Sequence, residues 1–73
     1  MSRVIELKPN DPIAYHNRGR AYFNKDDMDS AISDFNEAIK INPDNAEIYR
    51  ERGNAYLNNG DFEHAIADFD SAV

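Results

Sequence analysis

The 73-residue chain contains no cysteine and only two histidines, His16 and His64. The absence of cysteine excludes disulfide bonds and thiolate zinc sites, and two histidines are too few for an imidazole metal cage. A chain of this length buries only about 60% of its unfolded surface, so most domains this short are stabilised by disulfide bonds, by a metal or by association. We therefore expect stability to come from regular local packing or from association.

Basic residues are scarce as well: eight of them against fourteen acidic residues give a net charge of -6. Nucleic-acid binding needs a basic surface that displaces counterions from phosphates, and this charge balance argues against one. No apolar run approaches the ~18 residues of a membrane span, and the first residues do not form a secretory signal. We expect a small acidic globular protein with neither nucleic acid nor membrane as a partner. The sequence does not identify its compartment, for which the cytoplasm is the preferred assignment.

The residues that enzymes and metal sites require are also missing. Three glycines are too few for a phosphate-binding loop, and the serines form no recognisable triad pattern with the histidines. The acidic cluster of Asp26, Asp27 and Asp29 lacks the loop glycine and the terminal glutamate of an EF-hand calcium site. The sequence therefore predicts no catalytic activity, no cofactor and no metal site.

What the chain does contain is an internal repeat. A shift of 34 residues aligns residues 1–39 with residues 35–73, and 14 of these 39 pairs are identical, far above chance. The identical pairs include Pro9 and Pro43, Tyr15 and Tyr49, Arg18 and Arg52, Gly19 and Gly53, Tyr22 and Tyr56, Ala31 and Ala65, Asp34 and Asp68, and Phe35 and Phe69.

Each copy predicts two helices joined by a polar turn. In the first copy, Asp11 is a suitable N-cap and Pro12 is tolerated at the first helical position. Apolar and small residues then recur at helical spacing, and residues 24–27 form the turn to a second helix. The second copy predicts helices over residues 46–58 and 62–73. No window alternates with period two, so the predicted fold class is all-α.

The order of large and small residues in each copy resembles the tetratricopeptide repeat (TPR). The matching residues are Tyr15, Gly19, Tyr22, Ala31, Phe35, Ala38 and Pro43 in the first copy, and Tyr49, Gly53, Tyr56, Ala65, Phe69 and Ala72 in the second. The resemblance implies antiparallel helix-turn-helix repeats stacked as a short right-handed α-solenoid. Residues 1–73 would form one repeat domain, with residues 1–11 as the tail of a preceding helix and a linker, 12–45 as repeat 1 and 46–73 as a truncated repeat 2.

Two features depart from the family pattern. Arg18 and Arg52 stand where the family usually has a leucine-like residue, and an aspartate follows each arginine by sixteen residues. We expect ion pairs across the helices, Arg18 with Asp34 and Arg52 with Asp68, with the arginine stems packed among tyrosines. The turn of the first copy has Asp26 where the second keeps glycine, and aspartate tolerates a left-handed backbone better than most residues.

The resemblance implies a protein-interaction module without catalytic activity, which binds a peptide or a partner helix in a groove lined by the first helix of each repeat. The corresponding groove positions are Ile13, His16, Asn17, Arg20, Phe23 and Asn24 in repeat 1, and Glu47, Arg50, Glu51, Asn54, Leu57 and Asn58 in repeat 2. Residues 12–25 carry a charge of +3 and residues 46–59 are neutral, whereas residues 28–41 sum to -2 and residues 62–73 to -3. This asymmetry predicts an acidic ligand.

The alternative function is structural self-association. Residues 3–8 align with residues 37–42 and therefore look like the end of a missing helix, while the chain stops within the fourth predicted helix without a polar capping helix. Homo-oligomers would then form by end-to-end stacking or helix exchange. The residues predicted to associate are Val4, Ile5 and Leu7 at one end and Ile66, Phe69 and Val73 at the other.

Overall fold

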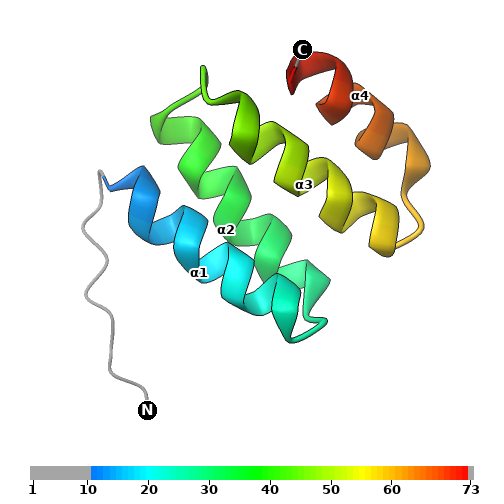
Figure 1. Cartoon of the computed structure of the whole chain (residues 1–73), viewed down its shortest axis with the longest axis horizontal. Helices are drawn as coiled ribbons and strands as arrows, with labels where there is room; N and C mark the ends of the chain where they lie inside the picture. The colour runs from blue at the N-terminus through cyan, green and yellow to red at the C-terminus, as the bar shows by residue number, and fades with distance from the viewer. Residues whose placement is uncertain (1–10, 73) are drawn as a thin grey trace.

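The computed structural model describes residues 11–72, which form four α-helices in a single row (Figure 1). The helices are α1 (Pro12–Asn24), α2 (Met28–Ile41), α3 (Ala46–Asn58) and α4 (Phe62–Ala72). Each helix packs on the next one, α1 also touches α3, and α1 and α4 share no contact. No strand occurs between residues 11 and 72, so the all-α prediction is confirmed. Within the same residues, no helix is long and apolar enough to cross a membrane.

The helix ends follow the capping residues in the sequence. The Asp11 carboxylate accepts hydrogen bonds from the backbone N–H groups of Ile13 (3.1 Å) and Ala14 (3.3 Å), and Pro12 occupies the first helical position, as predicted. The Asn45 side chain caps α3 in the same way, because its oxygen accepts from the N–H of Glu47 at 3.0 Å. These contacts satisfy backbone donors that have no partner inside a helix.

The two turns within the repeats share a left-handed residue. Asp26 has a φ of 67°, and Gly60, at the equivalent position of the second repeat, has a φ of 83°. The first repeat therefore makes the same turn with an aspartate in place of glycine, as the sequence predicted. The backbone N–H of Asp27 donates to the Tyr22 carbonyl, and that of Asp61 donates to the Tyr56 carbonyl, both at 2.9 Å, which closes the two turns alike.

The repeated glycines make room for phenylalanine rings. A Cβ atom on Gly19 would lie only 2.7 Å from Cε1 of Phe35, and one on Gly53 would lie 2.8 Å from Cε1 of Phe69. In the structure the atoms nearest to a Cβ on Gly19 all belong to the Phe35 ring. Each glycine thus lets a large ring from the next helix pack directly against its backbone.

The buried core is formed mainly by residues of α2 and α3. Phe35 and Ile48 are the largest fully buried side chains. The full cluster of buried residues consists of Met28, Ala31, Phe35, Ala38 and Ile39 from α2 and Ile48 and Ala55 from α3. Of α1, only Gly19 is buried. The tyrosines Tyr15, Tyr22 and Tyr49 pack against this core while partly exposed.

Candidate protein-interaction surface on α1 and α3

Both predicted arginine–aspartate pairs are present. Arg18 donates from Nε to Oδ2 of Asp34 at 2.7 Å and from Nη2 to Oδ1 at 2.8 Å. Arg52 makes the same bidentate contact with Asp68, because its Nε donates to Oδ2 at 2.8 Å and its Nη2 donates to Oδ1 at 2.7 Å. Asp34 and Asp68 are buried, 4% and 3% exposed, so these hydrogen bonds compensate for the loss of their hydration. The sequence prediction of the two pairs is confirmed.

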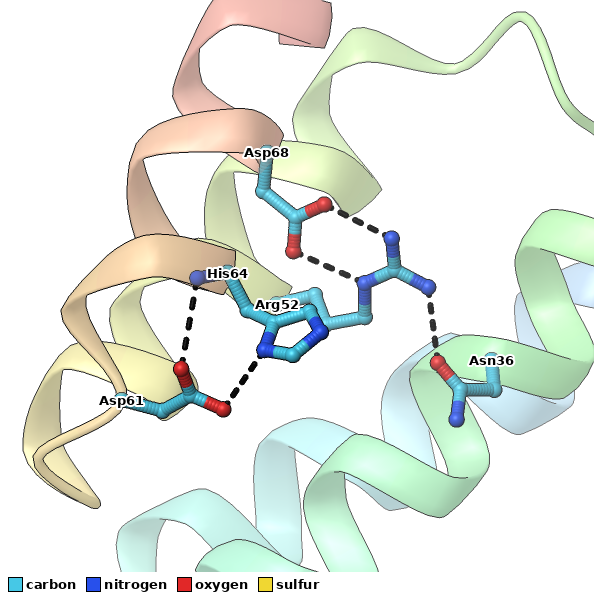
Figure 2. A network of polar contacts seen from close by, with 5 residues as sticks. All are labelled: Asn36, Arg52, Asp61, His64 and Asp68. Carbon is cyan, nitrogen blue, oxygen red and sulfur yellow. Dashed lines mark hydrogen bonds and ion pairs between the residues drawn. The ribbon is translucent and has the colours of Figure 1, made fainter.

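Arg52 makes a further contact that the sequence analysis missed. Its Nη1 donates to Oδ1 of Asn36 on α2 at 2.7 Å, so one guanidinium joins α2, α3 and α4 (Figure 2). The guanidinium carbon also lies 5.6 Å from the ring centre of Tyr49 and 5.7 Å from that of Tyr56. The hydrogen bonds with Asp68 raise the pKa of Arg52 above its ordinary value. In repeat 1, those with Asp34 raise the pKa of Arg18 in the same way.

His64 lies in the first turn of α4 and contacts Asp61, the residue before the helix. Its Nδ1 lies 2.7 Å from Oδ2 of Asp61, and its backbone N–H donates to Oδ1 of the same carboxylate at 3.3 Å (Figure 2). Its ring stacks on Tyr56 with the centres 5.0 Å apart. These contacts account for His64 as a side chain that orders the start of α4.

The first helices of the two repeats meet at His16 and Glu51. Nε2 of His16 on α1 lies 2.8 Å from Oε1 of Glu51 on α3, and Nε of Arg20 lies 3.8 Å from the same oxygen. The side chains of His16 and Glu51 are 13% and 20% exposed, and that of Arg20 is 58% exposed. Two groups of α1 that are able to bind a carboxylate therefore already hold one from α3.

Glu47 brings a second carboxylate to this place. The candidate metal-ligating atoms of His16, Glu47 and Glu51 all lie within 4.8 Å of one another. However, the guanidinium of Arg20 is close to Glu51, and a cation there opposes a second cation at the same carboxylate. We interpret the cluster as an ion-pair network between α1 and α3.

The remaining predicted groove residues differ in exposure. Leu57 is 44% exposed, whereas Phe23 is half-buried and packs against the core. Six further predicted positions are exposed, namely Asn17, Asn24, Arg50, Asn54, Asn58 and Ile13. Of all twelve positions, the structure brings His16, Arg20, Glu47 and Glu51 into one cluster.

A hollow of about 410 Å³ lies on α1 and involves residues that the sequence analysis had not grouped. Its lining residues are Asp11, Ile13, Ala14, Asn17, Arg18 and Ala21. Asn17 and Ile13 therefore border this hollow, although the sequence placed them in the groove. Four of its lining residues lie 34 positions before Asn45, which is the N-cap of α3, and before Ile48, Arg52 and Ala55 within α3.

Two protein-family models match this chain. A model described as "TPR repeat" matches residues 19–60, more than half of the chain, and one described as "Tetratricopeptide repeat" matches residues 1–33. The chain belongs to the tetratricopeptide-repeat family. A solved TPR-type structure, titled "Crystal structure of MamA", superposes with a TM-score of 0.80 at 30% sequence identity, over 84% of this chain and 36% of that one. No curated protein matches.

TPR units generally mediate protein–protein interaction, and the same function class applies here. The chain spans about a third of the length of the solved TPR-type structure that it matches.

Proposed function

We propose that this TPR domain binds an acidic peptide or an acidic face of a partner helix on the surface lined by α1 and α3. The observation that carries the proposal is the position of the Glu51 carboxylate, 2.8 Å from Nε2 of His16 and 3.8 Å from Nε of Arg20. The two α1 groups are arranged to bind a carboxylate, and a carboxylate from a ligand would compete with Glu51 for them.

The distribution of charge supports an acidic ligand. On this surface Arg20 of α1 and Arg50 of α3 are exposed cations, although the whole chain carries -6. A local basic surface on an acidic protein attracts acidic segments to that surface and repels them elsewhere, which favours the correct orientation of encounter. Asn54 and Asn58 on α3 are exposed and offer amide groups to a peptide backbone, and the exposed Leu57 offers an apolar contact.

The proposal is tested by fluorescence anisotropy with a labelled peptide of alternating glutamate and leucine, compared with its lysine counterpart. We expect the acidic peptide to bind more tightly, and Arg20→Glu to weaken its binding about tenfold, because like charges at an interface repel. Lys40→Glu is the matched control, since it makes the same charge change at a 72% exposed position on α2. Equal losses for the two variants would mean that only net charge matters and would refute the proposed surface.

A second variant tests the competition directly. Glu51→Gln removes the charge that His16 and Arg20 already hold, so the acidic peptide should bind a few-fold more tightly than it binds the unchanged protein. Glu37→Gln on α2 serves as the control, because Glu37 lies outside the surface and pairs only with Lys40 among the described contacts. No gain from Glu51→Gln, or an equal gain from Glu37→Gln, would contradict the proposed competition.

A further inference from the structure

The contact between α2 and α3 shows how one repeat stacks on the next. Two polar contacts join these helices: Nη1 of Arg52 donates to Oδ1 of Asn36 at 2.7 Å, and Nδ2 of Asn59 donates to Oδ1 of Asp29 at 3.3 Å. The apolar residues of α3 in this contact, Ile48 and Ala55, are 1% and 0% exposed, and they share one core cluster with residues of α2.

Within residues 11–72, no helix packs on the equivalent surface of α1. We call it the α1 outer face and define it as Asp11, Ala14, Arg18, Ala21 and Lys25, which lie 34 residues before their counterparts on α3. Ala21 is exposed where its counterpart is fully buried, and the side chain of Arg18 is 38% exposed where that of its counterpart is 19% exposed. Within residues 11–72, Nη1 of Arg18 has no hydrogen-bond partner. The hollow of about 410 Å³ lies on this face.

The equivalent surface of α4 is also exposed. We call it the α4 outer face and define it as Phe62, Glu63, Ile66 and Asp70, which lie 34 residues after Met28, Asp29, Ile32 and Asn36 of α2. Phe62 is 60% exposed, whereas Met28 is 7% exposed, and Ile66 is 61% exposed, whereas Ile32 is half-buried against the core. Phe62 and Asp70 were not among the residues that the sequence predicted to associate. Of those that were, Val4, Ile5, Leu7 and Val73 lie outside the described residues, and the Phe69 ring packs on Gly53.

We propose that the α4 outer face of one molecule docks on the α1 outer face of a second copy of this chain, in the register that α2 adopts on α3. Ile66 would then cover Ala14 and Ala21 and fill the hollow beside them. The two copies would be related head to tail, so that each contributes a different surface to the interface.

Charge complementarity identifies the second copy as the occupant. In the proposed register Asp70 takes the place of Asn36 and accepts from Nη1 of Arg18. The other polar contact, between Asp29 and Asn59, is replaced by Glu63 opposite Lys25.

The internal contact has two neutral residues, Asn36 and Asn59. In the contact between molecules they are replaced by Asp70 and Lys25, each of which is opposite in charge to the residue that it faces. The charges of the two faces agree with this, since the α1 outer face contributes Arg18 and Lys25 and the α4 outer face contributes Glu63 and Asp70. Head-to-tail stacking brings unlike charges together, whereas a symmetric dimer through either outer face would oppose like charges.

Sedimentation equilibrium of the 73-residue chain over a range of concentrations tests whether it associates. We expect reversible association that weakens as NaCl rises from about 50 mM to about 500 mM, because the paired charges are screened. Ile66→Glu should weaken association at least about tenfold, since a charge would be buried in the interface. Ser33→Glu, with the same charge change at an exposed position on α2, should not. A monomer at all concentrations up to about 1 mM would overturn the proposal.

Mixing two blocked variants tests the head-to-tail arrangement. Ala21→Arg blocks the α1 outer face and Ile66→Glu blocks the α4 outer face, and circular dichroism first confirms that both variants are helical. Neither variant should associate alone, because each retains only one of the two complementary faces. Together they should form a heterodimer of one copy each that grows no further, measured by light scattering after size-exclusion chromatography. Failure of the mixture to form that heterodimer, or assembly of either variant alone, would refute the docking of α4 on α1.

Discussion

Replacement of Asp68 by alanine removes the carboxylate that fixes Arg52 against α4. Asp68 is 3% exposed and accepts two hydrogen bonds from the guanidinium, at 2.7 and 2.8 Å. Breaking a buried pair by removing one partner costs about 3–5 kcal/mol. Here Arg52 keeps its bond to Asn36 and is 19% exposed, so we expect a loss of about 2–3 kcal/mol in the free energy of unfolding.

The equivalent change in repeat 1 should cost less. The side chain of Arg18 is 38% exposed, so after Asp34→Ala water can solvate the guanidinium, and we expect a loss of about 1–2 kcal/mol. A domain of 73 residues has a total stability of roughly 4–11 kcal/mol, so both losses are measurable. The larger one corresponds to a fall of about 10–20 °C in the melting temperature.

Urea unfolding followed by far-ultraviolet circular dichroism, at protein concentrations too low for association, measures both losses. A loss for Asp34→Ala as large as that for Asp68→Ala would refute the assignment of the difference to the exposure of the arginine. A double-mutant cycle of Arg52→Leu and Asp68→Ala should deviate from additivity by about 1–2 kcal/mol. Strict additivity would show that the pair contributes nothing to stability, whatever its geometry.

Two further predictions concern the backbone. Gly19→Ala should destabilise the protein by about 1–3 kcal/mol, because its Cβ would lie 2.7 Å from the Phe35 ring, and this outweighs the gain of about 1 kcal/mol in helix propensity. Phe35→Leu in the Gly19→Ala background should recover part of the loss in urea unfolding, and a stabilised Gly19→Ala would contradict the close contact. Asp26→Gly should stabilise by about 0.5–1 kcal/mol because φ is 67°, and Gly60→Ala, at φ 83°, should destabilise by about 1 kcal/mol. A lower melting temperature for Asp26→Gly, or a higher one for Gly60→Ala, would refute the left-handed conformation of these two turn residues.

Local features of the fold were predictable because they depend on neighbouring residues and occur twice. The 34-residue repeat and the capping residues predicted a helix over residues 46–58, and α3 covers Ala46–Asn58. The ion pairs were predictable for a related reason: an arginine and an aspartate separated by sixteen residues in both copies face each other across the same helix pair. A feature that occurs in both copies is easier to recognise in the sequence, because each copy supports the assignment made in the other.

Contacts between the repeats were not predictable from the same pattern. Asn36 binds Arg52, but the 34-residue shift aligns Asn36 with Asp70, so the repeat comparison contained no identity at that position. The pairing of Glu51 with His16 was missed because both were assigned to the groove as groups for a ligand. Such contacts depend on the angle and offset between successive repeats and on side-chain rotamers, which helical periodicity does not determine.

Arg52, which departs from the family pattern, makes a directional contact between the two repeats. A leucine at the position of Arg52 would pack against any apolar helix face, because hydrophobic contact has no direction. The planar guanidinium instead directs two N–H groups to Asp68 within its own repeat and a third to Asn36 of the preceding one, so this side chain favours one register between the repeats. On the α1 outer face, Arg18 presents the same third donor to any helix that docks there. A helix with an acceptor at the position of Asn36, such as α4 with Asp70, satisfies that donor, whereas one with leucine or lysine leaves it without a partner.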